Sequence, residues 1–129
     1  MSNQKIFCLC LHNHLLNKVK KLNYIPVGLG DEKFSNGWLR DNTNDNISKI
    51  NKFYGEYTFH YWLWKNYLDK IESEWIGFCQ YRKFFTRKDI TTKDISFENL
   101  QSISINEIDD NNFDCILGNK FSVENYKFS

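Results

Sequence analysis

The chain has 129 residues, the length of a single domain, and its 17 basic and 16 acidic residues leave a net charge of +1. This balance argues against a nucleic-acid-binding protein, which needs a strongly basic face. With 41% hydrophobic and 17% aromatic residues, the chain is too apolar for a disordered protein. No apolar run approaches the ~20 residues that a membrane-spanning helix requires.

The N-terminus is a poor signal peptide, because His and Asn interrupt its apolar part. We therefore expect a cytoplasmic protein. Peripheral attachment to the inner face of the membrane stays open, since a docking site can be too small to show in composition. Without a secretory signal, the four cysteines are expected to be reduced and buried. They are Cys8, Cys10, Cys79 and Cys115.

Strand-like and helix-like segments alternate along the chain, which predicts one α/β domain over residues 1–129. The only proline, Pro26, suits an edge strand or a strand end, because proline cannot donate to a central ladder. In chain order we expect strands at 5–11 and 24–27, a helix at 13–22 before the second strand, a glycine-punctuated loop through residue 46, a helix at 53–71, a strand at 75–79, a polar connection at 86–112 and a strand at 114–117.

The central helix carries aromatic residues at three- and four-residue steps, which predicts a buried apolar stripe. The stripe is formed by Phe53, Tyr57, Tyr61, Trp64, Leu68 and Ile71. Phe59, Trp62 and Leu63 would widen it. Tyr61, Trp62 and Trp64 could instead stack on a sugar ring, although such residues more often belong to a core.

Cys8, Cys10, His12 and His14 occur at every second position, which suggests a metal site. Alternate side chains of a strand lie roughly 6.6 Å apart, so four of them cannot converge on one ion with bonds of ~2.0–2.3 Å. Buried cysteines are the better interpretation. His12 stays a candidate binding residue, because the end of a first strand faces the crevice where open α/β sheets bind ligands.

A polar loop before the central helix offers groups that suit ribose and sugar hydroxyls. Its candidate binding residues are Asp41, Asn42, Asp45, Asn46 and Ser48. A solvated turn that caps the helix, through Asn46 or Ser48, is the competing interpretation. Asp41 and Asp45 could also hold a hard cation such as magnesium, although their spacing gives this little support.

Glu56 and His60 lie four residues apart and share a helix face. Beside a crevice they could act as a general base and its orienting partner, and we take them as the candidate catalytic pair. A solvated helix-surface pair explains the spacing equally well.

Tyr81, Arg82 and Lys83 follow the strand at 75–79 directly. Two cations at the end of a strand can neutralise a diphosphate, whereas ordinary solvation is the competing explanation. A phosphate-cradling glycine loop is missing, because Gly28-Leu29-Gly30 lacks the rest of either nucleotide fingerprint. The sequence also has no arrangement typical of a serine nucleophile.

Taken together, residues 41–85 resemble a domain of unknown function found in bacterial capsular and exopolysaccharide glycosyltransferases. That pattern is D-N-x-x-D-N-I-S, then N-x-x-Y-x-E-x-T-x-x-Y-W-x-W-K-N, then G-L-C-H-Y-R-R-x-F. The matching residues are Asp41, Asn42, Asp45, Asn46, Ile47, Ser48, Asn51, Tyr54, Glu56, Thr58, Tyr61, Trp62, Trp64, Lys65, Asn66, Gly77, Cys79, Tyr81, Arg82 and Phe85. The strand ending at His12 and the turn at Pro26-Val27-Gly28 also fit.

Two positions depart from the pattern: Gln80 replaces its His, and Lys83 replaces its second Arg. Gln80 keeps a hydrogen-bonding group but does not titrate near neutral pH. We therefore expect impaired chemistry if that His reacts, and a tolerated change if it only binds. The resemblance covers the N-terminal half of the family domain, so a partner chain could supply the other half.

The resemblance implies a nucleotide-sugar-dependent glycosyltransferase with a Rossmann-like, mostly parallel sheet of the GT-A type. The expected partners are a nucleotide-sugar donor and a glycan acceptor. A divalent cation, Mg or Mn, is a possible cofactor. No Asp-x-Asp motif follows a clear strand, however, so we expect Arg82 and Lys83 to contact the diphosphate in place of a metal ion. The alternative is a catalytically silent remnant that binds a nucleotide sugar or a glycan, or one half of a split enzyme.

Overall fold

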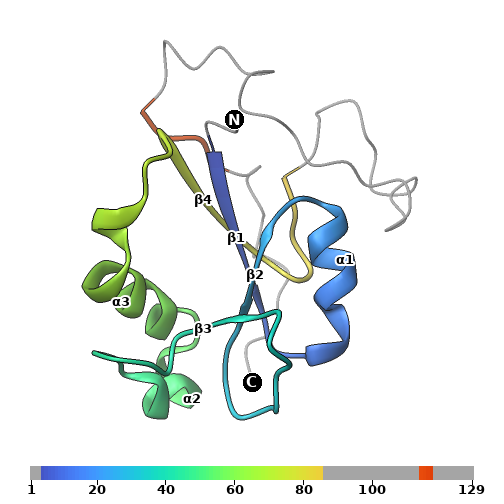
Figure 1. Cartoon of the computed structure of the whole chain (residues 1–129), viewed down its shortest axis with the longest axis vertical. Helices are drawn as coiled ribbons and strands as arrows, with labels where there is room; N and C mark the ends of the chain where they lie inside the picture. The colour runs from blue at the N-terminus through green and yellow to red at the C-terminus, as the bar shows by residue number, and fades with distance from the viewer. Residues whose placement is uncertain (1–3, 86–113, 118–129) are drawn as a thin grey trace, which may run out of the picture.

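The computed structural model describes residues 4–85 and 114–117, which include a four-stranded sheet with helices on both faces (Figure 1). The strands are β1 (Gln4–Cys10), β2 (Ile25–Gly28), β3 (Leu39–Arg40) and β4 (Trp75–Gln80). The α-helices are α1 (Leu16–Lys21), α2 (Asn51–Tyr54) and α3 (Tyr57–Asn66), and short 3₁₀ turns cover Asn13–Leu15, Ser48–Ile50 and Leu68–Lys70.

All strand pairs are parallel, and the order across the sheet is β3-β2-β1-β4. The expected α/β class is therefore confirmed, and the arrangement is compatible with a Rossmann-like half-domain. β3 had not been predicted, because a two-residue strand inside a polar loop has no hydrophobic period of its own.

Alternate residues of β1 enter two different cores. Cys8 and Cys10 face the side that α1 covers with Val19, whereas Phe7 and Leu9 face the side that α3 covers. In Figure 1, α1 and α3 lie on opposite sides of the sheet. The nearly continuous apolar run of β1 follows from this position, because a central parallel strand is buried on both faces.

Three of the four cysteines are buried and all four are free, as expected, but Cys115 is exposed. The Sγ atoms of Cys8 and Cys10 are 3.9 Å apart. The hydrogen bond with Cys8, together with burial, raises the pKa of the Cys10 thiol. This thiol therefore stays protonated and serves as an apolar filler of the core.

The predicted helix at 53–71 is wrong as a single element, because Gly55 interrupts it. Gly55 has φ +56° and ψ −130°, a conformation that only glycine adopts readily, and it ends α2. α3 then starts in a new direction and ends at Asn66. The expected single helix is therefore two separate helices.

The predicted buried stripe is also wrong. Phe53, Tyr57 and Trp64 are 74%, 66% and 59% exposed. The residues that pack on the sheet are those expected only to widen the stripe. They are Phe59, Trp62 and Leu63, which join Phe7, Leu9, Val27 and Leu29 in one cluster.

Pro26 lies near the start of β2, which agrees with the strand-end alternative: β2 is a central strand, but β3 pairs only with Val27 and Gly28, so the proline has no partner on β3. One further expectation is corrected. Residues 114–117 do not form a strand. The expected polar connection at 86–112 falls outside the described residues. None of the helices within residues 4–85 combines the length and apolar composition that crossing a bilayer takes.

Candidate functional site

The chain reverses its direction of winding between β1 and β4. From β1 it passes through α1 to β2 on one side, and it later returns through α3 to β4 on the other side of β1. Open parallel sheets bind ligands in the crevice at such a switch point, outside the carboxyl ends of the strands. Here those ends are Cys10 and Gln80.

Two neighbouring hollows open at this place. The wide hollow, of ≈ 700 Å³, lies beyond the ends of β1 and β4 and is walled by the segment from Asn51 to Tyr57. The narrow hollow, of ≈ 300 Å³, lies beside it and is lined by His60, Lys83 and the aromatic rings of residues 78, 84 and 85. Leu9, Glu56 and Gln80 line both hollows. The two hollows therefore form one composite site around these shared residues.

Glu56 and Gln80 are in direct contact at the boundary. The Nε2 of Gln80 donates a hydrogen bond of 2.6 Å to Oε2 of Glu56. Glu56 holds the N-cap position of α3, where the helix dipole favours a negative charge. Gln80 reaches it from the last position of β4. A carboxylate with one oxygen engaged retains the other as an acceptor for a ligand.

His60 follows Glu56 by one helical turn and lines the narrow hollow. Its ring contacts Phe78 edge-on, with the centroids 4.5 Å apart. Burial lowers the pKa of His60, and the charge of Glu56 offsets part of this effect. At neutral pH His60 is thus an uncharged imidazole, which can accept a proton. Glu56 and His60, the predicted catalytic pair, therefore both line the narrow hollow.

The cationic end of β4 is a tight turn. The backbone N–H of Lys83 donates to the carbonyl of Gln80 across 2.9 Å, and this turn places Lys83 at the narrow hollow. Arg82 is exposed, and its guanidinium lies 5.1 Å from the centroid of the Tyr81 ring. Tyr81 itself lines the wide hollow. Lys83 therefore lines the narrow hollow, whereas Arg82 lines neither hollow.

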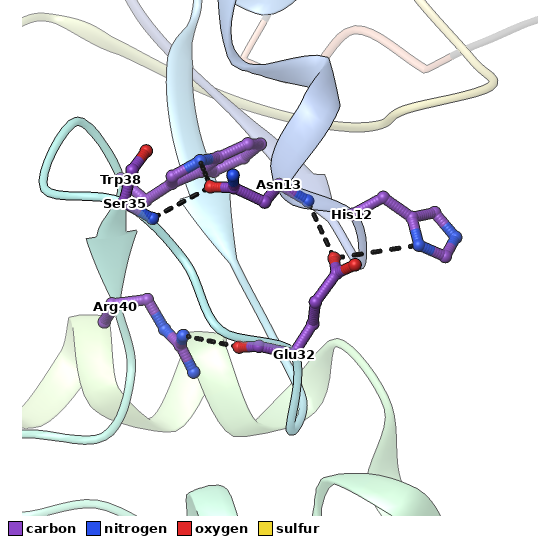
Figure 2. Close-up of polar contacts among 6 residues, drawn as sticks. All are labelled: His12, Asn13, Glu32, Ser35, Trp38 and Arg40. Atoms are coloured by element: carbon purple, nitrogen blue, oxygen red, sulfur yellow. Dashed lines mark hydrogen bonds and ion pairs between the residues drawn. The ribbon is translucent and has the colours of Figure 1, made fainter.

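His12 lies at the carboxyl end of β1, as predicted, between the ends of two other strands. Its ring meets Tyr81 edge-on, with centroids 5.7 Å apart, and its Nδ1 is 3.8 Å from Oε2 of Glu32 (Figure 2). Both members of the His12–Glu32 pair are about half exposed. Because Glu32 follows β2, the pair links the loops after two neighbouring strands.

The loop between β2 and β3 is tied down by Asn13, as Figure 2 shows. The Oδ1 of Asn13 accepts hydrogen bonds from the backbone N–H of Ser35 (2.8 Å) and from the indole N–H of Trp38 (3.0 Å). The backbone N–H of Asn13 donates to the carboxylate of Glu32. Arg40 donates to the carbonyl of Gly30 across 3.0 Å. These bonds hold the carboxyl edge of the sheet in one shape. No sequence pattern marks Glu32 as a site residue, because its partners are distant along the chain.

The loop at 41–48 has a different place from the one expected. Asp41 is fully buried, and its Oδ2 accepts a 2.6 Å hydrogen bond from the hydroxyl of Thr58. Burial raises the pKa of Asp41, although the Thr58 bond and the charge of Arg40 act in the opposite direction. Asp41 therefore anchors α3 to β3 and is not available as a direct ligand of a substrate.

The rest of this loop is hydrogen-bonded to side chains of α3. Thr43 accepts the indole N–H of Trp62 through its carbonyl at 3.0 Å, and Asp45 accepts the phenol of Tyr61 at 2.9 Å. Asn46 accepts the N–H of Ser48 at 3.2 Å, at the start of the 3₁₀ turn Ser48–Ile50. The expected cap of the central helix is wrong, because neither α2 nor α3 begins with a side-chain cap.

None of the loop's five predicted binding residues lines the wide or the narrow hollow. They are Asp41, Asn42, Asp45, Asn46 and Ser48. Asn42 and Asp45 are exposed and Asn46 and Ser48 are partly exposed. The loop therefore does not line the site with the end of β4; the wall that meets the end of β4 is formed by α2 and the start of α3.

The acidic side chains near the loop do not fit a cation site. Asp41 is buried and engaged with Thr58, and Asp45 is engaged with Tyr61. Over residues 4–85 and 114–117, no group of three or more His, Cys, Asp or Glu side chains is placed to hold a metal ion.

Comparison with known proteins yields one match. A family model described as a domain of unknown function, DUF4422, matches residues 5–128. No curated protein and no solved structure matches the chain.

Proposed function

Since the chain belongs to the DUF4422 family, whose description assigns no activity, we propose from the site itself that this protein binds a nucleotide sugar and transfers the sugar to a glycan hydroxyl. The observation that carries the proposal is the composite hollow at the β1/β4 switch point, where Glu56 and Gln80 meet. That place in an open parallel sheet favours a nucleotide ligand.

The dimensions of the site agree with two substrates. A hollow of ≈ 700 Å³ is in the range of small-molecule sites and accommodates the nucleotide part of a donor. The adjoining hollow of ≈ 300 Å³ suits one sugar unit. Residues that line both hollows, Glu56 among them, would then lie where the reacting atoms meet.

In the proposed reaction, Glu56 removes the proton of the acceptor hydroxyl. The hydroxyl oxygen of the acceptor bonds to the anomeric carbon of the donor sugar at the same time. The bond from that carbon to the diphosphate breaks, and the electron pair leaves with the diphosphate. Lys83 and Arg82 offset the charge of this leaving group. His60, uncharged at neutral pH, lies beside Glu56 and is the alternative base.

A binding-only role is the second candidate, and the Gln80–Glu56 bond favours it. The group that meets Glu56 at 2.6 Å is an amide that neither gives nor takes a proton near neutral pH. In this case the site retains a nucleotide sugar or a glycan without turnover. A partner chain that supplies further residues would restore the reaction.

The proposal keeps the expected cytoplasmic location. Free thiols at Cys8, Cys10 and Cys79 are typical of a reducing compartment.

Calorimetric titration with UDP-, GDP- and dTDP-sugars, each with and without EDTA, tests the proposed binding. We expect one donor to bind in EDTA, and the double variant Arg82→Ala/Lys83→Ala to weaken it at least tenfold. The matched control is Lys18→Ala/Lys20→Ala, which removes two exposed lysines of α1 on the other face of the sheet.

Four results test the proposal. Binding together with release of free sugar or extension of a glycan supports the transferase. Binding without turnover, at any acceptor concentration, supports the binding-only role. No binding of any donor overturns both, and binding that disappears in EDTA overturns the assignment of the diphosphate to Arg82 and Lys83.

A further inference from the structure

The wall of the wide hollow is aromatic and faces solvent. Phe53, Tyr54 and Tyr57 all line this hollow, and they are 74%, 56% and 66% exposed. Large exposed apolar side chains gathered at a hollow are typical of a binding surface. We call these three residues the aromatic wall.

The aromatic wall is held in place by polar contacts behind it. The side-chain amide of Asn51 donates to the carbonyl of Gly55 (2.8 Å) and to the hydroxyl of Thr58 (2.9 Å). Thr58 in turn donates to the buried Asp41. The wall therefore stands on a bonded framework that reaches the end of β3, and a ligand would meet a backbone that is already ordered.

The turn at Gly55 gives the wall its direction. Its φ of +56° ends α2 after Tyr54 and starts α3 near Tyr57, so aromatic residues from two helices border one hollow. A continuous helix through this point would not present the same set of rings. No atom lies within 4 Å of the place where a Cβ would stand on Gly55, so backbone conformation and not crowding requires glycine.

Polar groups line the same hollow as the rings. Gln80 and Glu56 offer amide and carboxylate atoms there. Aromatic rings and hydrogen-bonding groups in one hollow suit a flat ligand with a polar edge. Nucleobases have this form, and the faces of sugar rings with their hydroxyls share it.

We propose that Phe53, Tyr54 and Tyr57 form a stacking wall that binds the face of a ring carried by the substrate. The inference rests on the proposed function for the identity of that ring, which is either the nucleobase of the donor or a sugar of the acceptor. It names residues that bind and orient, and it assigns them no chemical step.

The test uses three variants of the full chain: Phe53→Ala, Tyr57→Ala and Trp64→Ala. Trp64 is the matched control, because it is an aromatic residue of α3, 59% exposed, that does not line the wide hollow. Binding of UMP, GMP, dTMP and AMP forms one arm, and binding of neutral and acidic oligosaccharides forms the other. Since all three side chains are exposed, circular dichroism and thermal unfolding should show the variants folded like the wild type.

We expect Phe53→Ala and Tyr57→Ala to weaken the bound ligand about 5- to 150-fold, the range that corresponds to the loss of one stacked ring, and Trp64→Ala to leave it unchanged. Phe53→Tyr and Tyr57→Phe, which keep the ring, should retain most of the affinity. A ligand from the nucleotide arm identifies a base-binding wall, and one from the oligosaccharide arm identifies a sugar-binding wall.

The outcomes separate this inference from the proposed function. If a nucleotide binds and the alanine variants bind it as tightly as the wild type, the wall is wrong and the donor site stands. If only an oligosaccharide binds, and the alanine variants lose it, the wall stands and the donor site is wrong. Equal loss in Trp64→Ala, or no binding in either arm, overturns the wall.

Discussion

Gln80 and Glu56 meet through a hydrogen bond of 2.6 Å, although they are 24 residues apart in the chain. One comes from the last position of β4 and the other from the start of α3, and both line the wide and the narrow hollow. This contact joins the two elements that flank the switch point. Both residues belong to the composite site, which Asp41 supports by anchoring α3 to β3.

Glu56→Gln should abolish most of the proposed transfer and leave donor binding nearly intact. A general base contributes typically 10²–10⁴-fold to a rate, so we expect a loss of about 100-fold or more in kcat. The assay is sugar transfer under saturating donor, with Asp69→Asn as the control for loss of an exposed carboxylate. A variant that retains full turnover would remove Glu56 from the mechanism.

Gln80→His should introduce a titrating group beside Glu56. The carboxylate favours the charged imidazole, so we expect the histidine of this variant to titrate above its usual pKa. Donor binding or turnover should then acquire a pH dependence that the wild type lacks. NMR titration of the new imidazole checks the pKa directly, and a midpoint below 6 would contradict the contact with a charged Glu56.

His60 should titrate below the usual histidine value of 6.5, because burial lowers its pKa. Glu56→Gln removes the charge that raises it, so the midpoint should fall further in that variant. With a lowered pKa in the folded state, the contribution of neutral His60 to stability is present above pH 6.5 and is lost as the pH falls below it. NMR titration of both proteins measures the shift; equal midpoints would show that Glu56 and His60 do not interact.

Asp41→Asn should alter how stability depends on pH. Burial raises the pKa of Asp41 above 3.8 in the folded protein, so folding favours the protonated form. Wild-type stability from this group is therefore greatest at low pH and declines as the pH rises through the window above 3.8. Asparagine does not ionise, and the decline due to this position should vanish.

Urea unfolding at several pH values between 4 and 8 measures the difference between Asp41→Asn and the wild type. Asp69→Asn, an exposed position, is the control that should leave the pH profile unchanged. If the free energies of unfolding of Asp41→Asn and the wild type stay parallel over the whole range, Asp41 is ionised in both the folded and the unfolded chain.

Gly55→Ala should destabilise the protein by about 1–3 kcal/mol, because a side chain at φ +56° and ψ −130° is strained. For a domain of this size, each kcal/mol lowers Tm by roughly 3–5 °C. Because the surroundings of Gly55 are open, steric overlap adds nothing. Lys52→Ala, on the exposed side of α2, is the control. An unchanged Tm for Gly55→Ala would mean that the break between α2 and α3 relaxes freely.

Much of the sheet could be predicted because its strands are defined locally. β1 and β4 are short apolar runs followed by polar residues. A central strand of a parallel sheet has this pattern whatever its partners are, because both of its faces are buried. β3 could not be found, because two residues in a polar loop become a strand only when β2 supplies their partners.

The site was predicted in part. Spacing and position after a strand indicate Glu56, His60 and Lys83, and the family resemblance indicates Gln80; the structure brings all four to the narrow hollow. The loop at 41–48 was placed there wrongly, because its composition cannot distinguish groups that meet a ligand from groups that bond to α3. Phe53 and Tyr57 were assigned to the core, since periodicity reports that a helix has an apolar face without saying where that face points.

The sequence by itself determined the α/β class, the buried strands, the reduced core cysteines and the residues that end β4. These follow from local patterns of apolar and polar side chains, which persist in any tertiary arrangement. The tertiary structure alone decided the strand order, the side of α3 that is buried and the meeting of Glu56 with Gln80. Each of these depends on long-range packing: α3 carries aromatic residues on both sides, and its contact with the sheet buries Phe59 and Trp62 and leaves Tyr57 and Trp64 exposed.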